Sequence, residues 1–233
     1  MTKKIICALV ICVVLCSVIV VPISAYSLPF TDVKVTSWQY KPVKKVYDIG
    51  IMNGVSSTRF EPNKKLTRAE AAMMLYNLEG GGASYTRYSF KDVKAGAWYA
   101  DAVEWMYKKG ITSGVTRDRF GVNEYITRQD FVTLVYQTYK LRWLDVSDSK
   151  EVYVNEKIVY NFKDHKEISS YAMQSMKFCS GVCMVVNFTV PKYHVNVTPI
   201  ISGHNGVVNP KGNCTRAEAA VIIGNVYSID KCF

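Results

Sequence analysis

The chain has 233 residues, of which 49% are hydrophobic, 21% charged and 12% aromatic, and its formal net charge is +10. This composition excludes a disordered chain and allows a packed core. The excess of basic residues favours polyanionic partners, but these residues are spread along the chain rather than gathered into a stripe, which argues against nucleic acid.

The N-terminal segment has the features of an export signal. Two lysines precede an apolar run over residues 5–21, and small residues follow as far as Ala25. We expect residues 1–25 to be a signal peptide that is cleaved after Ala25 or Ser27. The alternative is an uncleaved anchor, because about 17 apolar residues are at the lower limit for crossing a bilayer. Only that alternative would keep the protein in contact with a membrane.

Two later segments superimpose without a gap at an offset of 60 residues. Their identities lie in a fixed register and are too many for chance, so they define an internal repeat. The shared residues are Phe30, Asp32, Val33, Trp38, Gly50, Gly54, Phe60, Asn63, Thr67 and Arg68, which recur as Phe90, Asp92, Val93, Trp98, Gly110, Gly114, Phe120, Asn123, Thr127 and Arg128.

A third, divergent copy begins at Phe162 and closes with residues 215–220, a hexapeptide that the first copy has at 67–72. The third copy is longer between these landmarks, so we place an insertion of about 16 residues near 185–206. We therefore predict a signal peptide (1–25), repeat one (28–79), a Gly-rich linker (80–89), repeat two (90–140), a linker that could contain a short strand or a hairpin (141–161) and repeat three (162–228).

Each repeat predicts a helix, a Gly-rich loop and a second helix. In repeat two, apolar residues recur at helical spacing over residues 97–109, and Gly110 follows as a stop signal. We expect Gly54 and Gly114 in the loops to permit a positive φ. Because no such helix can bury its apolar face alone, we predict a mainly α fold, a pseudo-threefold helical bundle with short connecting strands or loops.

The start of each second helix carries a Thr-Arg-x-acid motif. In a capping box the threonine hydroxyl accepts from a free helix amide, while the acid accepts from the threonine amide. An aspartate is shorter than a glutamate and predicts a weaker box. The expected structural caps are Thr67 with Glu70, Thr127 with Asp130 (the weaker pair) and Thr215 with Glu218.

Four of the seven cysteines follow the signal segment. Four cysteines in an exported chain allow three disulfide pairings, and free buried thiols are an equal alternative. Their spacing does not suit a metal site, and we expect neither a metal nor a cofactor. The four are Cys179, Cys183, Cys214 and Cys232.

The first repeat contains, in order, the motifs FTDV, W, GIMNG, RFEPN and LTRAEAA. The second repeat has FKDV, W, GITSG, RFGVN and ITRQD at the corresponding positions. This series resembles the S-layer homology modules of Gram-positive bacteria, closely over residues 30–137 and partially over 162–227. The resemblance implies three modules that form a spindle with three grooves, and binding of pyruvylated secondary cell-wall polysaccharide. It also implies a secreted protein located at the cell wall or S-layer.

The resemblance implies a set of glycan-binding residues. The motif arginine is the family's usual ligand for the ketal carboxylate, and a helix start with a guanidinium is well suited to an anion. The tryptophan and the aspartate of the FxDV element line the family's groove. These roles fall on Arg68, Arg128, Arg216, Trp38, Trp98, Asp32 and Asp92.

Each of these residues has a simpler interpretation. The arginines could form ordinary ion pairs beside a helix start, the tryptophans could be core, and the aspartates could be helix or turn caps. Repeat three has Ser170 or Tyr171 where the others have tryptophan, and its insertion could reshape a groove. We therefore expect two good sites and one doubtful site.

No zinc-binding HExxH spacing and no nucleophile with a convincing partner occurs in the sequence, so we expect no enzyme activity. The favoured hypothesis is a noncatalytic anchor that binds anionic cell-wall polysaccharide. The alternative is a structural or partner-binding protein, in which the divergent third repeat contacts another exported protein during S-layer assembly or beside a wall enzyme.

Overall fold

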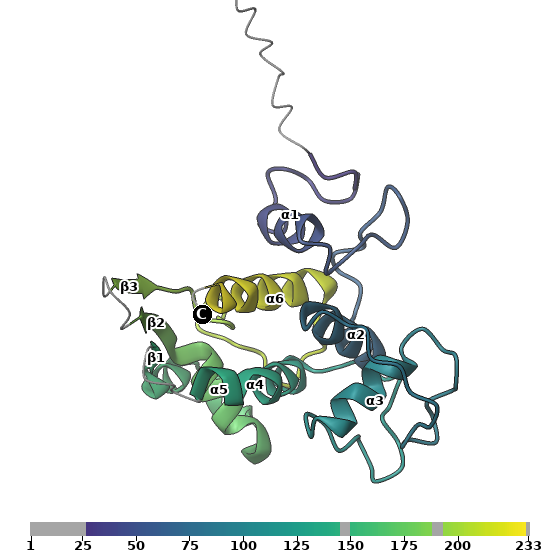
Figure 1. The fold of residues 1–233 in the computed structure, drawn as a ribbon. Helices are drawn as coiled ribbons and strands as arrows, with labels where there is room; N and C mark the ends of the chain where they lie inside the picture. Colours follow the sequence, from purple (N-terminus) through teal and green to yellow (C-terminus); the bar gives the residue numbers. More distant parts are fainter. Residues whose placement is uncertain (1–26, 145–149, 188–192, 232–233) are drawn as a thin grey trace, which may run out of the picture.

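The computed structural model describes residues 27–144, 150–187 and 193–231 (Figure 1). The expected signal peptide and Cys232 lie outside these residues. Within them, no helix is both long enough and apolar enough to cross a bilayer. The helices are α1 (Tyr40–Asp48), α2 (Arg68–Leu78), α3 (Ala100–Lys108), α4 (Arg128–Leu144), α5 (Met173–Gly181) and α6 (Arg216–Asp230), with short 3-10 helices η1 (Glu156–Asn161), η2 (His165–Glu167) and η3 (Ser170–Ala172).

The helices form three consecutive pairs, which confirms the mainly α fold built from helix-loop-helix repeats. The second helices of the pairs, α2, α4 and α6, surround a common centre (Figure 1). Each first helix packs on the second helix of the preceding repeat, so that α3 contacts α2 and α5 contacts α4. The arrangement closes because α1 packs on α6.

A ring of backbone hydrogen bonds ties the three repeats together just before their second helices. The Leu66 amide donates to Cys214 O at 2.8 Å, the Cys214 amide to Ile126 O at 2.9 Å, and the Ile126 amide to Leu66 O at 2.9 Å. Each repeat therefore supplies one donor and one acceptor to its neighbours. These bonds pair backbone groups that would otherwise be buried without partners.

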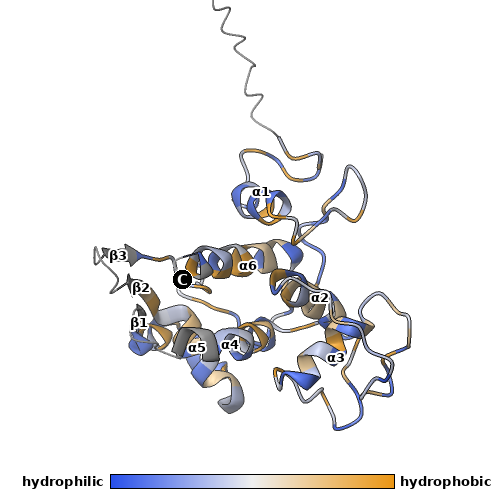
Figure 2. Ribbon diagram, viewed as in Figure 1, coloured by the Kyte–Doolittle hydropathy of each residue, from blue (hydrophilic) through white to orange (hydrophobic). Residues whose placement is uncertain are grey.

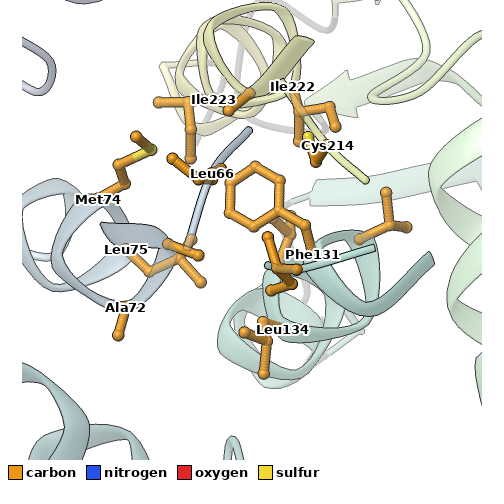
Figure 3. Packing of buried hydrophobic residues seen from close by; sticks show 14 of the residues in the cluster. Leu66, Ala72, Met74, Leu75, Phe131, Leu134, Cys214, Ile222 and Ile223 are labelled. Atoms are coloured by element: carbon orange, nitrogen blue, oxygen red, sulfur yellow. The ribbon is translucent and has the colours of Figure 1, made fainter. Parts of the chain in front are cut away.

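The core lies inside this ring. Figure 2 shows apolar residues on the faces of α2, α4 and α6 that turn inward, and Figure 3 shows Leu75, Phe131 and Ile223 meeting there beside Leu66 and Cys214. All five side chains are buried. Since such burial contributes about 1.5–3 kcal/mol for a large aliphatic side chain, contacts between repeats supply much of the stability.

Cys214 takes the place in this core that Leu66 and Ile126 take in the other repeats. Its thiol is free and buried, as is that of Cys179, while the free Cys183 is exposed. Burial raises the pKa of Cys214 to about 12. Of the two alternatives for these three residues, the structure shows free thiols.

The third repeat adds a small antiparallel sheet of β1 (Lys150–Val154), β2 (Val182–Asn187) and β3 (Tyr193–Asn196), in the order β1-β2-β3. The segment before repeat three therefore contains a strand, β1, as expected. This strand does not form a local hairpin but pairs with β2, which follows α5 in the chain. The end of β2 and β3 fall in the expected insertion.

The loop glycines are required for space. A Cβ on Gly54 would lie 2.4 Å from the Phe30 ring, and one on Gly114 would lie 2.5 Å from the Phe90 ring. Gly114 has φ +83°, as expected, whereas the expectation of a positive φ is wrong for Gly54. Close packing on the first phenylalanine of the repeat is what the two positions share.

Candidate functional site

The three motif arginines occupy equivalent, buried positions between repeats. Each begins a second helix, and each residue as a whole is only 7–8% exposed. The Nε atom donates to a carbonyl in the loop of the following repeat, which holds the guanidinium in place. These bonds are each 2.8 Å long and run from Arg68 to Phe120 O, from Arg128 to Val208 O and from Arg216 to Phe60 O.

An aromatic ring lies beneath two of the guanidinium groups. Arg68 lies over the Phe120 ring at 4.8 Å and Arg216 over the Phe60 ring at 4.6 Å. The third repeat has Val208 at the corresponding position, so Arg128 lacks this cation-π contact. Burial lowers the pKa of Arg68 and Arg216, but an arginine remains charged under all ordinary conditions.

The capping residues lie directly beside these arginines. Thr67 with Glu70 forms a complete capping box at the start of α2, and Thr215 with Glu218 does so at α6. In repeat two the Asp130 amide donates to the Thr127 hydroxyl at 3.2 Å. The Asp130 carboxylate accepts a hydrogen bond from the Thr127 hydroxyl at 2.6 Å. In a complete capping box it would accept from the Thr127 amide.

The FxDV aspartates organise their own loops. Asp92 accepts from the amides of Phe120, Gly121 and Val122 at 2.7–3.1 Å, and Asp32 accepts from two equivalent amides of repeat one. Partial burial acts to raise the pKa of both carboxyls, but these hydrogen bonds outweigh it and hold the pKa below its usual value. Direct contact with a sugar stays a prediction for these residues.

The two predicted tryptophans are exposed, so the simpler interpretation that they form part of the core is wrong. Trp38 is 62% exposed and Trp98 is 61% exposed. Each stands two residues before the first helix of its repeat. Tyr171 stands at the same distance before α5 and is 62% exposed, so repeat three does present an aromatic side chain at this position.

One cavity brings several of these features together, and we call it the Arg68 groove. It has a volume of about 730 Å³. All three repeats contribute: Arg68 from repeat one, the loop 110–114 and α4 from repeat two, and Tyr171 from repeat three. A smaller hollow of about 390 Å³ adjoins it and extends to Arg117. The α4 residues in the groove are Asp130, Thr133, Leu134 and Gln137.

Several groove residues were missed by the sequence analysis. Tyr171 was named only as one of two alternatives for the tryptophan position of repeat three and was given no binding role. The α4 residues Thr133 and Gln137 gave no signal beyond helical spacing. Their spacing from Asp130 does place all three on one helix face. This shared helix face could have indicated Thr133 and Gln137 as groove residues, once it was known that Arg68 of repeat one lies beside α4 of repeat two.

Comparisons with known proteins agree on the nature of the repeats. The model of the S-layer homology domain matches residues 29–72 and 89–132. An amylopullulanase of Thermoanaerobacterium thermosulfurigenes is 34% identical over 199 residues, which are 85% of this chain and 9% of that protein. An S-layer protein of Bacillus thuringiensis subsp. finitimus is 28% identical over 206 residues, which are 88% of this chain and 22% of that protein.

A third relative also matches this chain over only a small part of its own length. A surface-layer 125 kDa protein of Lysinibacillus sphaericus is 33% identical over 111 residues, 46% of this chain and 9% of that protein. The chain thus spans less than a quarter of the length of these relatives. The longer alignments extend beyond the two modules that the family model matches, which is consistent with a third module.

Proposed function

The chain is an S-layer homology domain protein, and on that premise we propose that it binds an anionic cell-wall polysaccharide in the grooves between its repeats. Domains of this family typically anchor surface proteins to the cell wall. We propose further that the protein acts without catalysis, as a secreted component of the wall or S-layer.

The observation that carries this proposal is the Arg68 groove. Its volume of about 730 Å³ lies within the range of about 300–1,000 Å³ that is typical of small-ligand pockets. It combines a buried, oriented guanidinium with the exposed Tyr171 ring. A guanidinium suits a carboxylate because it can donate two parallel hydrogen bonds, and an aromatic face can cover a sugar ring.

A pyruvate ketal is the ligand group that we propose for the arginines, because it places a carboxylate directly on a sugar. Arg68, Arg128 and Arg216 are the proposed carboxylate ligands. Trp38 and Trp98 are proposed to contact sugar rings. Asp32 and Asp92 are proposed to act mainly through the loops that they hold.

The test is sedimentation of the chain with purified bacterial walls before and after mild acid removal of the ketal. The Arg68→Ala, Arg128→Ala double variant is measured alongside, and circular dichroism checks that it folds. We expect both ketal removal and the double substitution to release the protein into the supernatant. Undiminished binding in both cases would overturn the proposal.

A second candidate function has one observation in its favour. The sheet β1-β2-β3 has edge strands, β1 and β3, that have no further strand beside them within the described residues, and such edges can pair with another chain. A partner protein could therefore dock on repeat three. Deletion of the edge strand β3 (Tyr193–Asn196) should then abolish partner binding and leave wall binding intact.

A further inference from the structure

The three arginine sites differ in the acid that faces the guanidinium. Each arginine is placed near the motif acid of the next repeat, because the repeats follow one another around the ring. Arg128 forms an ion pair with Glu218, with 2.9 Å between Nη1 and Oε1. Its Nη2 atom also donates to Ser202 O at 3.2 Å, so the protein itself occupies both terminal nitrogens.

Arg68 is in the opposite situation. Within residues 27–144, 150–187 and 193–231, its Nε has an acceptor, but its Nη atoms donate to no protein group and no carboxylate oxygen lies within 4.0 Å. Arg216 is intermediate, because its Nη2 donates to Asn53 O at 2.7 Å without an ion pair in the same part of the chain. The guanidinium with the most unused donors is therefore the one that lines the large groove.

The acid that faces Arg68 is held away from it. Asp130 is one methylene shorter than Glu218, and both of its oxygens are engaged elsewhere. Oδ1 accepts from the Tyr171 hydroxyl at 2.5 Å, and Oδ2 accepts from the Thr127 hydroxyl at 2.6 Å. Gln129 Nε2 donates to the same tyrosine oxygen at 3.0 Å, which fixes the position of the phenol.

We propose that the Arg68 groove is the dominant carboxylate site of the protein and that residue 130, held by Tyr171, determines this dominance. The inference rests on the proposed function and adds an order to its sites. At the Arg128 site, a ligand carboxylate must displace Glu218 and leave a partly buried charge without its partner, which is costly. At Arg68 no such displacement is needed.

The test measures calorimetric binding of a methyl 4,6-O-(1-carboxyethylidene) glucoside, a pyruvate-ketal sugar, with its uncharged methyl ester as the ligand control. We expect Arg68→Ala to weaken binding by about tenfold or more and Arg128→Ala to weaken it clearly less, by about two- to threefold. Thermal unfolding establishes that each variant folds.

Two variants keep both arginines and test the role of the acids. Asp130→Glu supplies an acid long enough to pair with Arg68, and we expect it to weaken binding by about fivefold. Glu218→Gln releases Arg128, and we expect it to add a second class of site without weakening the first.

The outcomes separate this inference from the proposed function. Equal losses in Arg68→Ala and Arg128→Ala, or wild-type affinity in Asp130→Glu, would overturn the ranking and leave wall binding through the ketal intact. No binding of the glucoside by the wild-type chain would also overturn the ranking. Wall binding that does not depend on the ketal would overturn both proposals.

Discussion

Gln129 holds Ser169 with both atoms of its side-chain amide. Its Oε1 accepts from the Ser169 backbone amide at 3.0 Å, and its Nε2 donates to the Ser169 hydroxyl at 2.9 Å. Gln129 is 3% exposed, and the other repeats have alanine at its position. The second repeat is therefore specialised to hold the divergent start of the third.

We expect Gln129→Ala to destabilise the fold by about 1–3 kcal/mol, because the Ser169 amide loses its acceptor in a partly buried site. Urea denaturation measures the change in the free energy of unfolding. A matched control is Gln174→Ala, which removes an exposed side-chain hydrogen bond to Glu156 and should change stability by less than about 0.5 kcal/mol. Equal effects of the two substitutions would contradict this role.

The Asp92 carboxylate should stabilise the fold in a pH-dependent way. Its pKa is lowered in the folded state, so its contribution is present above the unfolded pKa of about 3.9 and is lost as the pH falls through the folded value. We expect Asp92→Asn to cost about 1–3 kcal/mol at pH 7 and progressively less in acid.

Chemical denaturation of the wild-type chain and the Asp92→Asn variant between pH 7 and pH 2.5 measures this difference in the free energy of unfolding. Asp48→Asn is the control, because the Asp48 carboxylate pairs with Lys44 at the protein surface, where an ion pair contributes little to stability. A cost of Asp92→Asn that stays constant across the range would show that the charge is irrelevant.

Gly114→Ala should disrupt the loop that lines the Arg68 groove. The added Cβ would lie 2.4 Å from Arg119 O, and the residue has φ +83°. Gly80 has a similar φ of +89° but open space around it. We therefore expect Gly80→Ala to cost about 1 kcal/mol from the backbone alone and Gly114→Ala to cost clearly more, measured as the shift in the unfolding midpoint. Equal costs would contradict the close packing.

The cysteines should differ in their reactivity. Cys183 is exposed, whereas Cys179 and Cys214 are buried and burial raises the pKa of both thiols. Since the thiolate is the reactive form, iodoacetamide at pH 8 should modify Cys183 in the folded protein and the other two only after denaturation. Peptide mass mapping assigns each adduct, and rapid labelling of Cys214 in the native state would contradict its core position.

The sequence repeat predicted the helices, the capping pairs and the place of the arginines at helix starts, because those depend on local spacing and on apolar periodicity. It did not predict that the arginines are buried. It left Ser170 and Tyr171 as alternatives for the tryptophan position of repeat three. Counting from Phe162 gives Ser170, but repeat three has one more residue before its first helix, so Tyr171 stands two residues before α5, as the tryptophans do before α1 and α3. Nor could spacing show that Asp130 and Glu218 face arginines from a different repeat, since that depends on how the ring closes.

The most direct test of the account is a crystal structure of the chain with the pyruvate-ketal glucoside bound. The account predicts the ligand carboxylate on the Nη atoms of Arg68 at hydrogen-bonding distance, with the sugar in the groove between the loop 110–114 and Tyr171 and no displacement of Asp130. A carboxylate bound at Arg128 in preference to Arg68, or a sugar bound outside the groove, would contradict it.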